Sequence, residues 1–377
     1  MIYLFLVSMG FIAYTYAVFP LLLHLRARSQ PVLSTVVPEH WPSVSIVIPT
    51  CNEARFLPAR LNNLAALDYP ASKVEWIFVS NGSTDGTEAW LHSAFFGYPD
   101  RKYLHLATPV GKSSAIKQGV ALASGRIIVF MDARLPVSGN ALKKLVPYLQ
   151  YPEVGAVSGE LVLSDPTSLA AGNFGLYWRY EKWIRENESR LYSTTGVTGA
   201  LYAIRRRDFK PNRNATLLDE FDTPVRLLKQ GKRTLFVAGA HAYDKASDNI
   251  RQEFQKKVRN LAGNWQSFQA NPWLFQPSRN PVWWQFLSHK LFRLLVPYAL
   301  ITAFVSALLG EGTFLDIMFA LQWIFYVLVA ASYLNMPGTG NRVMNLLKVI
   351  VQLNAAALMA TLHHLKGQQP PGRGRSG

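Results

Sequence analysis

The pattern of apolar and polar positions divides the chain into two kinds of sequence. From Ile2 to Leu25 no Asp, Glu, Lys or Arg occurs, and about 20 apolar residues are what a helix needs to cross the hydrocarbon core of a membrane. Three more apolar stretches lie late in the chain, at about 294–309, 314–334 and 343–362. The pattern therefore predicts four membrane-spanning helices.

Other interpretations apply to some of these stretches. A secretory signal peptide matches the first one poorly, because it lacks a basic start and a small-residue cleavage site before Arg26. The stretch 294–309 is short and contains Pro297, so a buried core helix is its alternative. Residues 283–293 mix aromatic and cationic side chains, which predicts a helix lying in the membrane interface.

The region between the first and second apolar stretches has a different pattern, in which short β-branched runs alternate with helical patterns. Such alternation predicts a mostly parallel sheet whose strands are joined by right-handed crossovers. Strands are expected at Val44–Pro49, Val74–Val79, Tyr103–Leu106 and Ile127–Met131, and helices through Leu61 and Leu67, through Trp90, and over Lys112–Ala123 and Asn140–Leu149.

Polar side chains follow the predicted strands at their carboxyl ends, where open α/β sheets bind ligands. One fully apolar strand ends in the triplet Asp132-Ala133-Arg134. Asp132 is a candidate metal or phosphate-site carboxylate, whereas the guanidinium of Arg134 cannot ligate a cation. The other predicted strands lead into Thr50, Asn52, Glu53, Asn81 and Lys112.

The distribution of charge predicts how the protein is oriented in the membrane. The formal net charge is +16, and residues 26–293 carry +13 of it, as 34 Lys and Arg against 21 Asp and Glu. This excess predicts a cytoplasmic middle part. With four spans the basic tail would lie outside, which leaves one span open to being re-entrant or interfacial. The cations are scattered without a nucleic-acid motif, so no nucleic-acid partner is expected. The single Cys51 excludes an intrachain disulfide.

Several motifs occur in a fixed order along the middle part. They resemble the successive signatures of the family-2 inverting glycosyltransferases, the membrane-bound group that includes the cellulose, chitin, hyaluronan and poly-N-acetylglucosamine synthases. The resemblance runs from about Val44 to Gln266 and implies an α/β nucleotide-diphospho-sugar transferase (GT-A type) domain with a mostly parallel, mixed sheet, plus transmembrane α-helices. The motifs are Ser45–Glu53 (SIVIPTCNE), Val79–Thr87 (VSNGSTDGT), Gly111–Gly119 (GKSSAIKQG) and Val154–Gly159 (VGAVSG).

The expected domain plan combines the apolar stretches with this resemblance. It predicts a multi-pass protein of the cell (inner or plasma) membrane whose oligomeric state stays open. Its parts are a transmembrane helix (1–25), a linker (26–40), a cytoplasmic glycosyltransferase domain (41–270), an interfacial region (271–293), about three transmembrane helices (294–364) and a disordered basic tail (365–377).

The resemblance implies donor-side roles for individual residues. Asn52 and Glu53 fall where the family meets the nucleotide, and Thr50 stands at the same strand end. Asn81 falls where many members place an Asp against the base, usually uracil; a turn with a left-handed residue is the alternative. Lys112, beside a helix N-terminus, suits a diphosphate.

The same resemblance implies a metal site at the triplet Asp132-Ala133-Arg134. Asp132 corresponds to the first Asp of the family's Asp-x-Asp motif, and Arg134 replaces the last. We favour Asp132 as the ligand of Mg²⁺ or Mn²⁺, with the donor phosphates completing the shell. In the alternative, Arg134 pairs with the diphosphate and partly substitutes for the ion.

Acceptor-side roles follow from the resemblance as well. Glu220 occupies the position of the general base that takes the proton of the acceptor hydroxyl. Asp219 is its rival, because the acid order is inverted here. In the other alternative, all three acids, Asp219, Glu220 and Asp222, only favour a helix N-terminus. Thr198, Gly199 and Ala200 belong to a small-residue segment implied to lie beneath the acceptor.

A last motif lies at Gln255–Gln266, where processive members carry Gln-x-x-Arg-Trp. Arg259 matches the Arg and is a candidate diphosphate clamp, while Trp265 is a candidate stacking platform for the acceptor. A basic amphipathic helix on the membrane surface is the alternative. The departures from the motif weaken the case for processive synthesis.

The sequence thus predicts transfer of a sugar from a nucleotide diphosphate, with a UDP-sugar favoured, to a growing polysaccharide or a lipid-linked acceptor at the cytoplasmic face. One alternative is a single addition to a lipid carrier without polymer export. The other is a catalytically silent membrane subunit that binds sugar nucleotides.

Overall fold

The computed structural model describes residues 1–163, 169–211, 219–244, 250–334 and 342–367, and the predicted disordered tail lies largely outside this described part. The chain divides into two compact units. The sheet unit consists of Gln30–Ser164 and Glu188–Lys245. The helical unit consists of Met1–Ser29, Asp165–Asn187 and Ala246–Gly377.

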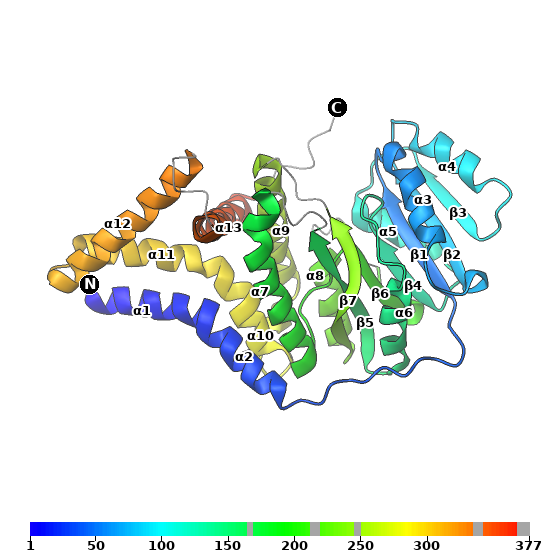
Figure 1. Ribbon diagram of the computed structural model, residues 1–377. Helices are drawn as coiled ribbons and strands as arrows, with labels where there is room; N and C mark the ends of the chain where they lie inside the picture. The colour runs from blue at the N-terminus through cyan, green and yellow to red at the C-terminus, as the bar shows by residue number, and fades with distance from the viewer. Residues whose placement is uncertain (164–168, 212–218, 245–249, 335–341, 368–377) are drawn as a thin grey trace. The chain divides into compact units, whose positions relative to one another are not determined.

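The sheet unit is built on one seven-stranded sheet with the order β3-β2-β1-β4-β6-β5-β7 (Figure 1). Strands β1 to β4 run parallel, and β6 is antiparallel to both of its neighbours β4 and β5, so the predicted mostly parallel, mixed sheet is confirmed. The strands are β1 (Val44–Thr50), β2 (Val74–Asn81), β3 (Arg101–Leu106), β4 (Ile127–Met131), β5 (Val154–Leu163), β6 (Leu201–Arg205) and β7 (Arg233–Asp244).

Helices cover both faces of this sheet. On one face α3, α4 and α6 pack against the strands, and on the other α5 and α8 do so. Short 3-10 turns connect them at Ala54–Phe56, Ala71–Lys73, Val146–Gln150 and Arg206–Asp208. The helices are α3 (Leu57–Ala65), α4 (Thr87–Phe95), α5 (Lys112–Ala121), α6 (Ala141–Leu145) and α8 (Asp219–Lys229).

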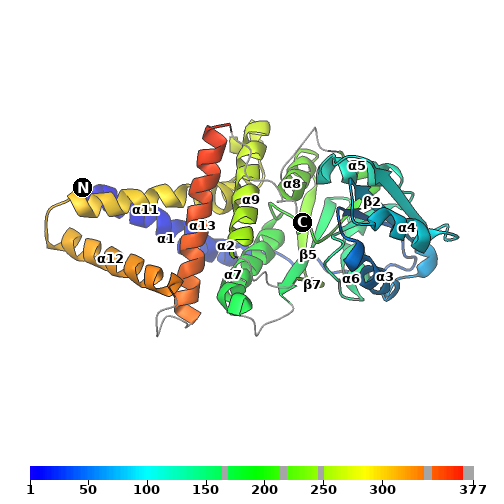
Figure 2. The same ribbon diagram turned by 90° about the horizontal axis from the view of Figure 1, so that it is seen from above.

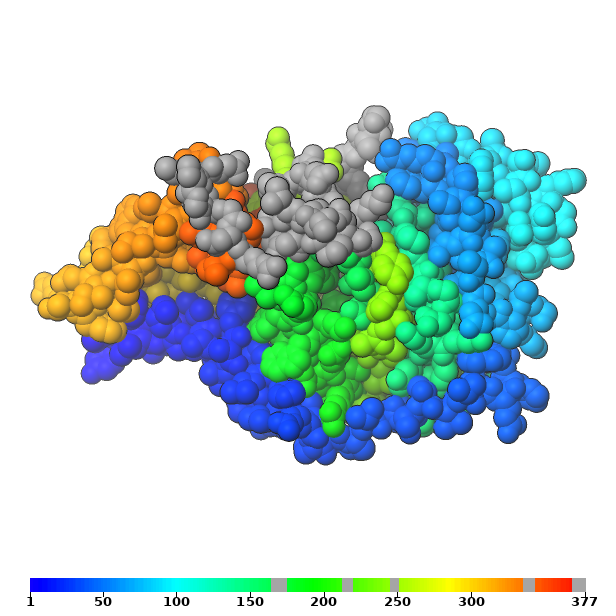
Figure 3. Space-filling view, viewed as in Figure 1, coloured from blue at the N-terminus to red at the C-terminus, as the bar shows by residue number. Residues whose placement is uncertain are grey.

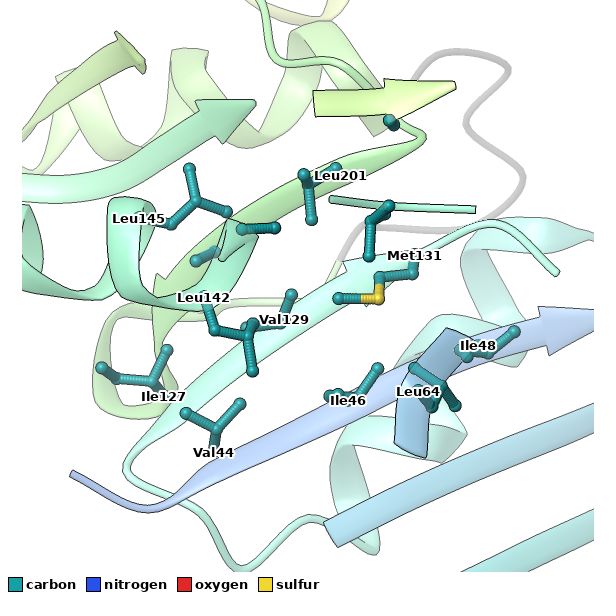
Figure 4. Packing of buried hydrophobic residues seen from close by; sticks show 14 of the residues in the cluster. Val44, Ile46, Ile48, Leu64, Ile127, Val129, Met131, Leu142, Leu145 and Leu201 are labelled. Carbon is teal, nitrogen blue, oxygen red and sulfur yellow. The ribbon is translucent and has the colours of Figure 1, made fainter. Parts of the chain in front are cut away.

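The core explains why β1 and β4 read as continuous apolar runs. Alternate residues of a strand point to opposite faces, so a strand covered on both faces is apolar throughout. Val47 and Ile128 pack with the α5 side, while their neighbours pack with α3 and α6. Figure 4 shows the second set converging: Val44, Ile46, Ile48, Ile127, Val129, Met131, Leu142, Leu145, Leu64 and Leu201.

Residues 30–43 form an extended segment on the surface of the sheet unit, shown in blue in Figure 3. Several hydrogen bonds attach it; among them, the Tyr151 hydroxyl donates to the Ser34 carbonyl (2.6 Å), and the Gln150 amide donates to the Val36 carbonyl (3.0 Å). The segment predicted as a linker is therefore tied to the domain that it enters.

The helical unit contains four helices that are long and apolar enough to cross a membrane, counted among the described residues: Ile2–Arg28, Trp283–Leu309, Thr313–Tyr333 and Val343–Leu365. Helix α1 lies along α11, and α13 lies along α9 (Figure 2). The elements are α1 (Ile2–Ala13), a π-turn (Tyr14–Val18), α2 (Phe19–Arg28), α7 (Leu169–Leu191), α9 (Ile250–Ala270), a 3-10 turn (Pro272–Phe275), α10 (Trp283–Gln285), a π-turn (Phe286–Leu291), α11 (Phe292–Leu309), α12 (Thr313–Tyr333) and α13 (Arg342–Leu365).

The second apolar helix starts earlier than its sequence pattern predicts. It begins at Trp283 rather than at Leu294, because α10, the π-turn and α11 form one continuous helical run. The aromatic and cationic residues expected in a separate interfacial helix thus form the first turns of this span. Pro297 lies inside α11 without ending it.

A buried ionic cluster joins two helices of this unit. Glu181 of α7 accepts hydrogen bonds from the Arg293 guanidinium and from His289 (3.2 Å). Burial alone would raise the pKa of Glu181, but Arg293 and His289 outweigh it and hold that pKa well below its usual value. Breaking such a pair leaves an uncompensated buried charge, so the cluster fixes how α7 packs on the Trp283–Leu309 helix.

Candidate active site

The carboxyl end of β4 places Asp132 next to a lysine. Lys112 is the first residue of α5, and its ammonium lies 2.8 Å from the Asp132 carboxylate. Both side chains are about one third exposed. An ammonium at a helix N-terminus and a carboxylate at a strand end thus share the edge at which open α/β sheets bind phosphates.

A second ion pair lies at the same edge. The Nε–H of Arg134 donates to both carboxylate oxygens of Glu53, at 2.8 and 2.6 Å. The Arg134 guanidinium also lies 5.2 Å from the ring centre of Phe56. The Glu53 side chain is only 7% exposed, whereas that of Arg134 is 48% exposed. A buried carboxylate needs a paired cation, and here Arg134 supplies it.

Asn52 and Asp85 organise the loop between β2 and α4. Asn52 has a φ of 55°, a left-handed conformation that Asn tolerates better than most residues. Its side-chain oxygen accepts the backbone N–H of Thr84 (2.7 Å). Asp85 accepts the backbone N–H groups of Thr87 (3.1 Å) and Ala54 (2.9 Å). The side-chain oxygen of Asn52 is thus already bonded within the loop.

Two other predicted donor-side residues lie at strand ends. Thr50 is 1% exposed, and its hydroxyl donates to the Val79 carbonyl (3.2 Å), so it is a buried strand residue. The side-chain oxygen of Asn81 accepts the backbone N–H of Val110 (2.8 Å). The amide NH₂ of Asn81 is then the group left to meet the edge of a base, and it can only donate.

Helix α3 holds the loop that follows Asp132. The Asn63 side chain hydrogen-bonds both backbone groups of Val137: it accepts the N–H (2.9 Å) and donates to the carbonyl (2.8 Å). Arg60 donates to the Leu135 carbonyl (2.9 Å). Burial lowers the pKa of Arg60 to about 10, and the charge of Asp132 opposes this shift.

Sequence reasoning missed Arg60 and Asn63. The one available signal was that Arg60 stands between Leu57 and Leu64 on the buried stripe of a short amphipathic helix. A charged residue at such a position needs a specific partner.

The small-residue segment, Thr198 to Ala200, leads directly into β6, which pairs with β4. Met131 of β4 pairs with Leu201 of β6, and the backbone nitrogen of Asp132 lies 3.4 Å from the Ala200 carbonyl oxygen. The backbone N–H of Thr198 donates to the Ser158 hydroxyl (2.8 Å). The candidate metal residue and the segment predicted beneath the acceptor are therefore adjacent.

Glu220 lies against the other side of this segment. Its backbone carbonyl accepts the N–H of Val197 (2.8 Å). A Cβ built on Gly199 would overlap the Glu220 carboxylate, so a larger residue there would force that side chain to shift. The structure thus brings Asp132, Ala200, Gly199 and Glu220 into one contiguous arrangement. The side chain of Asp219 lies outside the described part of the structure.

Arg259 and Trp265 both stand on α9, in the helical unit. The Trp265 indole N–H donates to the Thr361 hydroxyl (3.0 Å), and its ring stacks on His364 with an interplanar angle of 17°. Trp265 therefore packs against α13.

The residues at the donor side fit a cation that shares its ligands with phosphates. No group of three or more His, Cys, Asp or Glu side chains in the described ranges can hold a metal ion alone. Asp132 is partly exposed, and one of its two oxygens meets Lys112. A site for Mg²⁺ or Mn²⁺ with one protein carboxylate and donor phosphates is compatible with this donor set.

Part of the sheet unit is similar to a known protein family. Residues 45–211 match the family model described as Glycosyl transferase family 2. This part of the chain is thus similar to a family 2 glycosyltransferase domain. The matched region contains all the described donor-side residues and the segment 198–200, while Glu220 lies just beyond it.

The individual relatives of the chain have several specificities. An N-acetylglucosaminyltransferase of Rhizobium sp. is 25% identical over 239 residues, which cover 58% of this chain and 52% of that protein. A beta-monoglucosyldiacylglycerol synthase of Nostoc sp. is 34% identical over 196 residues, 49% of this chain and 41% of that protein. The chain therefore spans about half the length of these curated relatives, and the narrower likeness to polysaccharide synthases stays a prediction.

A solved structure shares the fold of nearly the whole chain. A mannosyltransferase from Pyrobaculum calidifontis, in complex with GDP-Man and Mn²⁺, superposes with a TM-score of 0.72 at 22% identity. The match covers 96% of this chain and 99% of that one. The sheet unit accordingly has the predicted GT-A type fold, in a chain whose described residues include four helices apolar enough to span a membrane.

Proposed function

We propose that the chain is a membrane-bound inverting glycosyltransferase that moves a sugar from a nucleotide diphosphate to a lipid-linked or glycan acceptor. The observation that carries this proposal is the contact of Glu220 with Gly199, one residue from the carbonyl that faces the backbone of Asp132. A candidate base and a candidate phosphate site thereby lie on either side of one short segment.

On the donor side, the chain's own residues bind and orient the diphosphate. Lys112 and Arg134 place two cations at the strand ends, and the N-terminus of α5 adds its backbone N–H groups. A divalent ion bound by Asp132 would stabilise negative charge on the leaving diphosphate. For the nucleobase of the donor we favour uracil, because its two carbonyl oxygens can accept hydrogen bonds from the NH₂ of Asn81.

On the acceptor side, Glu220 removes the proton of the attacking hydroxyl. The hydroxyl oxygen forms a bond to the anomeric carbon while the bond to the diphosphate breaks, so one displacement inverts the anomeric centre. General-base catalysis of this kind contributes roughly 10²–10⁴-fold in rate. Gly199 holds the carboxylate at the segment on which the acceptor would rest.

The acceptor class follows from the membrane helices and the relatives. Four apolar helices and a basic middle part support action at the cytoplasmic membrane face. The named product of the 34%-identical relative is a glycolipid. Because Trp265 packs against α13, we favour a single addition to a lipid-linked acceptor over synthesis of an exported polymer.

The test is a nucleotide-sugar screen with the purified protein in membrane mimetic, with Mg²⁺ or Mn²⁺ and mixed lipid acceptors. We expect release of nucleoside diphosphate together with a glycolipid that carries one sugar. Long glycan chains as the main product would support the polymer alternative. No turnover of any donor, with nucleotide binding retained, would support a silent binding subunit.

A further inference from the structure

The pair formed by Glu53 and Arg134 points to a specific role for a residue that cannot bind metal. We propose that Arg134, oriented by Glu53, binds the donor diphosphate directly, so that binding of a nucleoside diphosphate does not depend on a divalent cation. This inference rests on the proposed function. Glu53 acts in it as a positioning residue.

The geometry of the pair leaves the outer end of the guanidinium available. Arg134 uses only its Nε–H toward Glu53, at 2.6 and 2.8 Å from the two carboxylate oxygens. In the described part of the chain its two terminal NH₂ groups have no hydrogen-bond partner, and nearly half of the side chain is exposed. Those groups form the planar fork that binds phosphate oxygens in pairs.

Two contacts hold this fork in place. Glu53 is buried beneath it, and the ring of Phe56 lies 5.2 Å from the guanidinium carbon. The loop that carries Arg134 is itself held by Asn63, through both backbone groups of Val137. A guanidinium fixed in this way loses little conformational entropy when it binds a ligand.

The local charge supports the same conclusion. Where Asp-x-Asp would place a carboxylate, this chain has a guanidinium, which changes the formal charge at that position from −1 to +1. The difference equals the charge of one divalent cation. Arg134 and Glu53 together form a neutral pair, so a diphosphate meets hydrogen-bond donors at a position where a carboxylate would repel it.

The test measures binding of UDP and of GDP by calorimetry, in EDTA and in Mg²⁺, with the full chain in membrane mimetic. We expect the wild type to bind one of them in EDTA within roughly tenfold of its affinity in Mg²⁺. Arg134→Ala should weaken binding in EDTA roughly 10- to 100-fold, as expected for lost charge-assisted hydrogen bonds. Arg134→Lys, which keeps the charge without the fork, should fall between them.

A matched control is Arg55→Ala, because the Arg55 guanidinium lies 4.6 Å from the centre of the same Phe56 ring and forms no ion pair in the described part of the chain. It should bind nucleotide as the wild type does. Unfolding temperatures verify that each variant is folded. If Arg134→Ala does not fold, the binding test uses Arg134→Lys instead.

The positioning role of Glu53 needs a double-mutant cycle. Glu53→Gln should change nucleotide affinity in EDTA when Arg134 is present and leave it unchanged in the Arg134→Ala background. Equal changes in both backgrounds would show that Glu53 meets the nucleotide on its own and would overturn this role.

Two results separate this inference from the proposed function. If the wild type binds nucleotide only when metal is present, or if Arg134→Ala binds in EDTA as tightly as wild type, the inference is wrong and the proposed function stands. If neither nucleotide binds in either buffer, the proposed function fails.

Discussion

On the donor side of the site, four charged side chains form two ion pairs at strand ends, Lys112 with Asp132 and Arg134 with Glu53. On the acceptor side, a carboxylate lies so close to the backbone of Gly199 that an added methyl group would displace it. A partly exposed side chain such as that of Arg134 can be replaced without a steric overlap, whereas an added Cβ at Gly199 moves the Glu220 carboxylate. Substitutions on the donor side therefore act through charge, and those at Gly199 act through the position of Glu220.

The substitution with the largest expected effect is Asp132→Ala, which tests the donor side. It removes the one carboxylate of the donor side that lies at the end of β4, and with it the stabilisation of the leaving diphosphate. We expect transfer to fall roughly 10²–10³-fold. Rates of diphosphate release measure this effect. Full activity of this variant would remove Asp132 from the site.

The second is Gly199→Ala, which tests the acceptor side. A Cβ at this position overlaps the Glu220 carboxylate, so the base must move by about an ångström. A misplacement of that size can cost roughly 10²-fold in rate. Nucleotide affinity, measured by calorimetry, should not change, because the donor side is untouched. Gly175→Ala, in helix α7 where the new Cβ has open space, is a control for the general effect of the substitution.

The third and smallest effect is expected for Asn63→Ala. The variant releases the backbone of Val137 and loosens the loop that carries Asp132 and Arg134. We expect a loss of roughly tenfold in nucleotide affinity, the equivalent of about 1–2 kcal/mol. A loss of stability without a change in affinity would confine Asn63 to the fold.

Much of the sheet unit could be predicted from the sequence. The strands β1, β2 and β4 are buried on both faces and therefore read as apolar runs, and their polar ends lie at the predicted edge. The pattern did not predict β6 as a strand. It inserts antiparallel between β4 and β5, and its pairing depends on residues far away in the sequence.

The individual contacts of the site were less predictable. Roles at Asp132, Lys112 and Glu220 followed from a family resemblance, but the pairing of Arg134 with Glu53 joins residues 81 positions apart. The overlap of Gly199 with Glu220 is likewise a property of the folded backbone. Such contacts arise from tertiary packing, and local residue patterns carry no information about them.

The central claim is that Glu220, and not Asp219, is the base. The most direct test compares transfer rates of Glu220→Gln and Asp219→Asn, both with nucleotide affinity verified as that of the wild type. The account predicts a loss of roughly 10²–10⁴-fold for Glu220→Gln and near wild-type transfer for Asp219→Asn. The reverse order, or wild-type transfer by both variants, would contradict it.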